Sequence, residues 1–144
     1  MDVTQRDSYK AFAEFAKDKF GGVDILVNNA AIYAGLERRN FEEIDEDVWD
    51  QVMSVNVKGV WQMSRAVTPL MRQAGGGAIV NVASATVLSG SPKWMHYVAS
   101  KGAVIAMTRS MARELSDDGI HANVLAPGFT LTEASKDLIE DAEH

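Results

Sequence analysis

The sequence predicts an α/β protein built around a parallel β-sheet. Three short β-branched segments, at 23–27, 78–83 and 120–125, alternate with longer segments whose apolar residues recur at helical spacing. Strands and helices that alternate in this way form right-handed βαβ units, which build parallel sheets. We therefore expect one domain over residues 1–144, with helices covering both faces of its sheet.

The helices are expected where apolar periodicity lies between recognisable start and stop signals. The first follows Asp7 or Ser8 as its cap and stops at Gly21-Gly22, while residues 1–4 look like the end of a strand that runs into it. Acidic residues at 45–47 begin a second, long helix, because negative charge is favourable at a helix N-terminus.

Glycine and proline mark the ends of the remaining elements. The strand at 23–27 ends abruptly in the tight loop 28–31, as a buried parallel strand does. The long helix stops at the three glycines of 75–77. A polar loop over 84–93 then precedes a third helix at roughly 95–116, and the last strand ends at Pro127-Gly128.

Composition excludes several classes of partner. The formal charge of -6 opposes a surface for nucleic acid, and the absence of cysteine excludes disulfides and a thiolate nucleophile. The histidines at 96, 121 and 144 lack the spacing of metal ligands, so we expect no metal site. No basic leader or membrane-length apolar run occurs, so we expect a cytoplasmic protein without a membrane partner.

The strongest catalytic signal is a tyrosine and a lysine on the third helix. Tyr97 and Lys101 are four residues apart, so their side chains share one helix face. A free phenol titrates near 10, and a nearby ammonium lowers that pKa by favouring the phenolate. Tyr97 is therefore a candidate acid or base, although a single Tyr-x-x-x-Lys pair is a weak signal on its own.

Two further polar residues support this candidate site. Ser84 follows the strand 78–83, at the edge of the sheet where ligands bind in α/β proteins, and could hold a substrate carbonyl. Asn56 lies inside the long helix, where asparagine is unfavourable. It predicts a satisfied core amide, a local kink, or a backbone distortion that holds water near Lys101. Taken singly, Ser84 is more typical of a turn residue.

Together these residues resemble the classical short-chain dehydrogenases/reductases over nearly the whole chain. The family motifs appear in order and at approximate spacing: Asn28-Asn29-Ala30, Asn56, Ser84, Tyr97-x-x-x-Lys101 and Pro127-Gly128-x-x-x-Thr132. The resemblance, which extends to 3-oxoacyl carrier-protein reductases, implies a Rossmann-like, doubly wound parallel sheet. The family's first two strands, its last strand and its Gly-x-x-x-Gly-x-Gly turn have no counterpart, so both ends look truncated.

The resemblance implies an oxidoreductase in which NAD or NADP exchanges a hydride with a secondary alcohol or ketone. Tyr97 would exchange the proton, Ser84 would orient the substrate, and Asn56 would anchor a relay water. Lys101 would bind the nicotinamide ribose and lower the pKa of Tyr97. The implied cofactor-binding residues are Asp2, Val3, Asn28, Ala30, Tyr97, Lys101, Pro127, Gly128, Thr130 and Thr132.

Other readings of the sequence remain open beside the oxidoreductase. The chain could be a non-catalytic interaction module descended from such an enzyme, or an epimerase or dehydratase that shares Tyr-x-x-x-Lys. Small residues on the third helix favour close packing, so we expect a homo-oligomer: Ala99, Gly102, Ala103 and Ala106. An apolar wall of the substrate pocket is expected from Val87, Leu88, Trp94 and Met95.

Overall fold

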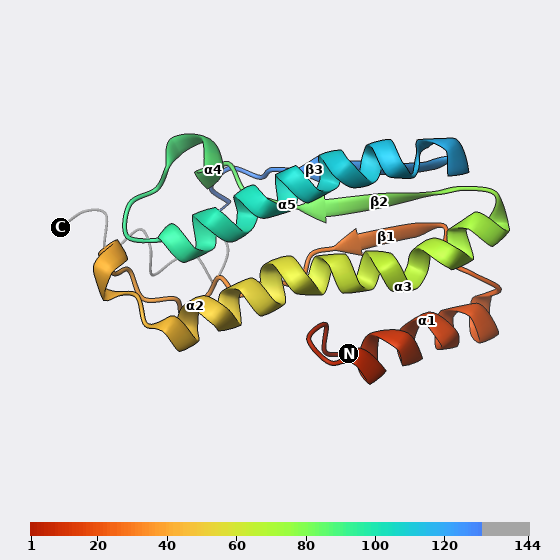
Figure 1. Ribbon diagram of the computed structural model, residues 1–144, viewed down its shortest axis with the longest axis horizontal. Coiled ribbons are helices and arrows are strands. Elements are labelled where there is room, and N and C mark those ends of the chain that lie inside the picture. Colours follow the sequence, from red (N-terminus) through yellow and green to blue (C-terminus); the bar gives the residue numbers. More distant parts are fainter. Residues whose placement is uncertain (131–144) are drawn as a thin grey trace.

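The computed structural model describes residues 1–130 and contains a three-stranded parallel sheet (Figure 1). Its strands are β1 (Ile25–Asn28), β2 (Gly77–Val82) and β3 (Ile120–Leu125), in the spatial order β1-β2-β3. Ile25 pairs with Ala78, and Gly77 pairs with Ile120. The α/β class and the parallel sheet are therefore confirmed, with strand positions close to those that the sequence predicts.

Three long helices pack on one side of this sheet (Figure 1). They are α1 (Arg6–Phe20), α3 (Gly59–Ala74) and α5 (Met95–Glu114). Helices α3 and α5 contact the strands directly, whereas α1 packs against α3. One apolar core joins them: Tyr9, Leu26, Met63, Val67, Met71, Ile79, Leu115, Ile120 and Ala122.

The prediction that helices cover both faces of the sheet is wrong for the described part of the chain. Ile25, Val27 and Leu125 lie on the face opposite the helices and are all more than half exposed. The chain crosses the sheet in one direction, from β1 to β2 to β3. Right-handed crossovers in one direction place every connecting helix on the same face, so α3 and α5 cannot lie on opposite sides.

The first helix begins differently from its prediction. Gln5 is its N-cap residue and gives no side-chain cap, so neither Asp7 nor Ser8 caps it. The Ser8 hydroxyl instead accepts a hydrogen bond from the backbone N–H of Asp2 at 2.8 Å. Asp2 in turn accepts hydrogen bonds from the backbone N–H and the hydroxyl of Thr4. Residues 1–4 therefore form a turn rather than the end of a strand.

The long predicted helix is divided by a wider turn. Helix α2 (Glu46–Met53) begins at Asp45, whose carboxylate accepts a hydrogen bond from the backbone N–H of Asp47. A π-helical turn, Ser54–Lys58, then leads into α3. The turn contains Asn56, so the predicted backbone distortion at this residue is present.

The segment between β2 and α5 contains a short helix in place of an uninterrupted loop. Helix α4 (Thr86–Ser89) begins just after Ser84, whose hydroxyl accepts a hydrogen bond from the backbone N–H of Thr86 at 3.2 Å. Gly90 ends the helix in the left-handed conformation, with φ of 65°. Across residues 1–130, no helix is both long enough and apolar enough to span a bilayer.

Candidate active site

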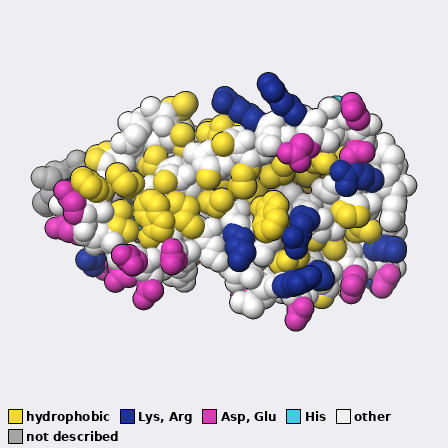
Figure 2. Space-filling view, in the orientation of Figure 1, with side chains coloured by type: hydrophobic (Ala, Val, Ile, Leu, Met, Phe, Trp, Pro, Cys, Tyr) yellow, Lys and Arg dark blue, Asp and Glu magenta, His cyan; other side chains and the backbone are white. Residues whose placement is uncertain are grey.

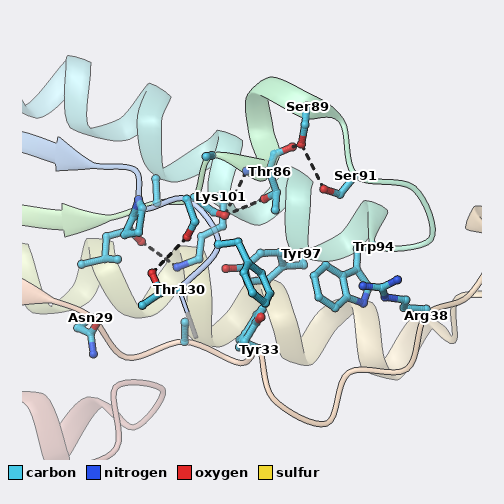
Figure 3. Close-up of a pocket in the computed structure, with 18 residues that line it drawn as sticks. Asn29, Tyr33, Arg38, Thr86, Ser89, Ser91, Trp94, Tyr97, Lys101 and Thr130 are labelled. Carbon is cyan, nitrogen blue, oxygen red and sulfur yellow. Dashed lines mark hydrogen bonds between the residues drawn. The ribbon is translucent and has the colours of Figure 1, made fainter. Parts of the chain in front are cut away.

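A cavity of about 770 Å³ opens at the carboxyl ends of β2 and β3 (Figure 3). Parallel α/β sheets bind their ligands at this edge, because the loops that follow the strands gather there. The cavity is lined by Asn29, Ala31, Tyr33, Arg38, Val82, Ala83, Ser84, Ala85, Thr86, Ser89, Ser91, Trp94, Tyr97, Lys101, Pro127, Gly128, Phe129 and Thr130.

Ser84, Tyr97 and Lys101 meet in this cavity. Tyr97 and Lys101 stand one turn apart on α5 and are 7% and 4% exposed. The Ser84 hydroxyl, just beyond β2, lies close enough to the Tyr97 phenol to lower its pKa. The Lys101 Nζ lies 5.7 Å from the centre of the Tyr97 ring and donates a hydrogen bond to the Val82 carbonyl at 2.8 Å. Two side chains from α5 and one from the segment after β2 thus meet in one cavity.

Burial shifts the pKa values of Tyr97 and Lys101. Burial raises the pKa of the Tyr97 phenol, the nearby Ser84 hydroxyl opposes that rise only in part, and Tyr33 adds to it. Burial also lowers the pKa of Lys101 to about 8. The sequence analysis predicted a lowered Tyr97 pKa from the neighbouring Lys101, whereas in this structure the pKa is raised, because burial is the largest effect and Lys101 is not among its causes.

Asn56 supports the site from beneath and does not line the cavity. Its amide oxygen accepts a hydrogen bond from the backbone N–H of Ile32 at 2.7 Å, and its amide nitrogen donates to the Ile32 carbonyl at 3.2 Å. The same nitrogen donates to the Ser100 hydroxyl at 3.1 Å. Asn56 thus connects the loop after β1 to the helix that carries Tyr97. Its role with a relay water stays a prediction.

Asn28 is turned toward the helices and away from the cavity. Its amide nitrogen donates hydrogen bonds to the Ser64 hydroxyl at 3.1 Å and to the Asn81 amide oxygen at 2.8 Å. Asn81 then donates to the Thr108 hydroxyl at 2.9 Å. The strand alternation of β1 explains this orientation, because alternate residues from Leu26 face the core.

Two residues of the loop after Asn28 contribute to the cavity. Asn29 and Ala31 line it, whereas Ala30 is exposed and does not. Counting from the last buried residue of β1 could have separated these two sets, because side chains alternate along a strand. The predicted adenosine contacts of Asn28 and Ala30 stay untested.

The predicted residues near the two ends of the described chain differ in position. Pro127, Gly128 and Thr130 line the cavity, whereas Thr132 lies outside the described residues. Asp2 is exposed and does not line the cavity. Val3 also lies away from the cavity and packs over Gly59, where an added Cβ would come within 2.7 Å of its Cγ2.

An aromatic group forms the wall beside the phenol. The rings of Tyr33, Trp94 and Tyr97 lie with centres 5.5 to 5.8 Å apart, and the Arg38 guanidinium lies 4.9 Å from the centre of the Trp94 ring (Figure 3). Trp94 confirms one residue of the predicted apolar wall. Three others do not line the cavity: Val87, Leu88 and Met95.

Sequence reasoning missed Tyr33 and Arg38 as residues of this site. Both lie in the loop after β1, which has no periodicity to show the direction of its side chains. Only the position of that loop, after the carboxyl end of a parallel strand, gave a signal that it would contribute to a binding site.

Comparison with known families decides the classification. Residues 1–143 match the family described as short chain dehydrogenase. The chain belongs to the short-chain dehydrogenase family. This family membership agrees with the meeting of Ser84, Tyr97 and Lys101 at the sheet edge, and it supports the oxidoreductase ancestry that the motifs predict.

Individual short-chain dehydrogenases match almost all of the chain. It is 40% identical over 142 residues to a 3-oxoacyl-[acyl-carrier-protein] reductase of Thermotoga maritima, covering 99% of this chain and 56% of the relative. The corresponding reductase of Vibrio cholerae is 37% identical over 142 residues, covering 98% of this chain and 57% of the relative. The chain thus spans little more than half the length of these relatives.

A solved structure confirms the fold. The crystal structure of a gluconate 5-dehydrogenase from Burkholderia cenocepacia J2315, in complex with NADP and tartrate, superposes with a TM-score of 0.91. The sequences are 35% identical, and the match covers 99% of this chain and 55% of that one. The described strands and helices are therefore part of the Rossmann-like fold of the family.

Proposed function

We propose that this chain carries the proton-transfer site of an NAD(P)-dependent oxidoreductase that acts on a secondary alcohol or ketone. The observation that carries the proposal is the convergence of Ser84, Tyr97 and Lys101 in one cavity at the carboxyl edge of the sheet. Family membership supports it, and the gluconate 5-dehydrogenase relative contains NADP.

The residues present fit the nicotinamide end of such a cofactor. The cavity offers small side chains at Ala31 and Ala85 beside the polar groups of Asn29 and Thr130, and a flat ring needs such a space. When bound, the cofactor supplies or accepts a hydride. We propose that Lys101 and the segment Pro127–Thr130 hold its nicotinamide ribose and carboxamide.

In the direction of reduction, the chain's own groups handle the proton. Ser84 and Tyr97 donate hydrogen bonds to the carbonyl oxygen, and the phenol O–H bond then breaks as its proton moves to that oxygen. The raised pKa of Tyr97 keeps the phenol protonated before the reaction. Lys101 stabilises the resulting phenolate, because its ammonium lies over the same ring.

The test compares two buried tyrosines in a chimera that joins the N-terminal portion of a relative to this chain. Tyr97→Phe should lower turnover at least 100-fold and leave nicotinamide binding intact, because only the proton-transfer group is lost. Tyr9→Phe is the matched control, since Tyr9 lies in the core between α1 and α3. Comparable turnover in the two variants would overturn the assignment of Tyr97.

A second readout separates the two roles proposed for Lys101. Lys101→Ala in the same chimera should weaken nicotinamide binding and lower turnover together, because one side chain serves both the ribose and the phenolate. Cofactor affinity that stays at the level of the unsubstituted chimera would contradict the ribose contact. Calorimetric titration with NADH and NADPH measures the affinity and also reveals which of the two is preferred.

The 144 residues alone should bind NAD(P)H only weakly. They contain no Gly-x-x-x-Gly-x-Gly turn, and the pyrophosphate normally lies on the backbone N–H groups of a helix that follows such a turn. Titration of the purified chain with NADH checks this expectation. Low-micromolar binding to a monodisperse monomer would show that the glycine-rich turn is dispensable.

One observation favours a second candidate, a non-catalytic interaction module. The open face of the sheet carries Ile25, Val27 and Leu125, whose apolar side chains are more than half exposed. Such a surface suits association with another subunit. A chimera that carries out hydride transfer only with Tyr97 present would favour the enzyme over this module.

A further inference from the structure

The cavity concentrates positive charge in a chain that is acidic as a whole. The sequence has 20 acidic residues and 14 lysines and arginines, which makes a carboxylate the more frequent charged group. Side chains of both signs occur on the face of the molecule that Figure 2 shows. Among the described residues that line the cavity, however, the charged side chains are Arg38 and Lys101, and none is Asp or Glu. The cavity therefore favours an anionic ligand over a cationic one.

Arg38 and its neighbour Arg39 differ in their contacts. Arg39 forms a salt bridge with Glu37, and its backbone N–H donates to the Lys93 carbonyl at 3.0 Å. Arg38 has no salt bridge within residues 1–130, and its guanidinium instead lies over the Trp94 ring. A guanidinium stacked on a ring keeps its N–H donors, which point outward in its own plane and match the oxygens of a carboxylate or phosphate.

Trp94 adds a second donor at the same place. Its side chain is 6% exposed, yet its indole Nε1–H has no hydrogen-bond acceptor among the described residues. Buried donors are almost always paired, so an indole N–H without an acceptor is unusual. Figure 3 shows the indole and the Arg38 guanidinium side by side, at the end of the cavity away from Lys101.

The aromatic wall between Tyr97 and Arg38 determines how far from the reacting group a charged group of the ligand can lie. The centres of the Trp94 and Tyr97 rings are 5.8 Å apart, and Arg38 lies against the far side chain, Trp94. A ligand with its carbonyl at the phenol therefore reaches Arg38 with an atom several bonds away. Thr86, Ser89 and Ser91 also line the cavity, where the hydroxyls of Ser89 and Ser91 are hydrogen-bonded to each other.

We propose that Arg38 is a substrate-specificity residue, which binds a carboxylate or phosphate carried several bonds away from the reacting carbonyl or alcohol, with the indole N–H of Trp94 as a second donor. This inference rests on the proposed function, because it names the substrate class of the same cavity. Binding measured without nicotinamide tests it separately from hydride transfer.

The test uses two pairs of small probes that differ in charge and share a carbon skeleton. Tartrate is compared with threitol, and glycerol 3-phosphate is compared with glycerol. Each is titrated into the ¹⁵N-labelled 144-residue chain while the indole N–H resonance of Trp94 is followed. Trp94→Phe assigns that resonance among the three tryptophans. The anion of at least one pair should shift it and bind about tenfold more tightly than its neutral partner.

Two arginine variants locate the contact. Arg38→Gln should remove the preference for the anion, whereas Arg39→Gln should keep it within about twofold. Both side chains are exposed, so neither substitution disturbs the core. Tightening by tartrate alone identifies a carboxylate, and tightening by glycerol 3-phosphate alone identifies a phosphate. Equal binding of charged and neutral probes, an unmoved Trp94 resonance, or equal losses in the two variants would overturn the proposal.

Discussion

The two faces of the sheet carry similar side chains and have opposite environments. On the helix side Ile79 is fully buried, whereas on the open side Ile25 and Val27 are 64% and 57% exposed. Val27 directly follows the buried Leu26 on β1. Hydrophobicity alone does not decide which of these residues is covered. The handedness of the crossovers decides it, because both connecting helices are directed to one face.

The covered face also holds the polar side chains that position the site. Asn28, Asn81 and Thr108 form a chain of hydrogen bonds from β1 through β2 to α5. Asn29 follows β1, Ser84 lies just after β2, and Tyr97 is on α5. The network therefore sets the relative position of the segments that form the cavity. On the open face, by contrast, a side chain affects association more than the shape of the site.

The largest difference between the faces should appear when isoleucines are shortened. Ile79→Ala should lower the free energy of unfolding by about 2–5 kcal/mol, because it removes core contacts and leaves a cavity. Ile25→Ala should change it by less than about 0.5 kcal/mol, since the side chain is mostly in solvent. Urea unfolding followed by circular dichroism measures both. Equal losses would mean that the open face is covered in solution.

A matched pair of asparagines sharpens the comparison for polar groups. Asn81→Ala should cost about 1–3 kcal/mol, because Asn28 loses an acceptor and Thr108 loses a donor in the core. Asn123 lies on the adjacent strand with its side chain exposed, so Asn123→Ala should be nearly neutral. A neutral Asn81→Ala would show that the buried network does not stabilise the sheet.

The elements that the sequence predicted well are those with local patterns. The strands follow from short β-branched runs, and α5 follows from the segment between a polar loop and Gly119 that carries Tyr97 and Lys101 at helical spacing. Ser84 was located by its position after a strand. Tyr97 and Lys101 are therefore positioned by α5 and Ser84 by the end of β2, and the topology brings the two elements together.

The features that sequence analysis missed depend on the environment of a side chain in three dimensions. Burial of Tyr97 raises its pKa, and no spacing of residues reports how much solvent reaches a phenol. Arg38 lies in a loop without periodicity, so its contact with Trp94 had no local signal. The fact that Asn29, and not Asn28, lines the cavity follows from the alternation of side chains along β1, which depends on where that strand ends.

Substitutions on the open face of the sheet should weaken self-association of the chain, whereas substitutions of exposed apolar residues elsewhere should not. Val27→Lys should weaken self-association by about tenfold or more, because a charge on an edge strand opposes both apolar burial and strand pairing. Leu88→Lys is the control, since Leu88 is exposed on α4. Light scattering over a concentration series measures the effect. A larger effect from Leu88→Lys would transfer the contact to α4.

The smallest predicted effect is the pH dependence of the free energy of unfolding that comes from Lys101. Its ammonium donates a hydrogen bond to the Val82 carbonyl at the end of β2. Burial lowers the folded-state pKa of Lys101 to about 8, below its usual value of 10.5. Above pH 8 the unfolded chain therefore binds more protons than the folded one, and stability rises with pH. The free energy of unfolding should gain about 1 kcal/mol between pH 7 and 9.5 relative to Lys101→Met. A constant difference between the two proteins contradicts this.

The site depends on the exact number of residues in the π-helical turn Ser54–Lys58. Such a turn accommodates one residue more than an α-helical turn, with hydrogen bonds between residues five apart. Wound as a continuous α-helix, the same residues would rotate α3 by about 100° relative to α2 and take Val52 or Met63 out of the core. Deleting Val55 would instead leave a regular helix with both apolar faces in place, and would remove the wide turn that presents Asn56 to Ile32. Deleting one residue from this turn would therefore keep the packing of the core and lose the contact that holds the loop after β1. A substitution of a side chain would not distinguish these two effects in the same way.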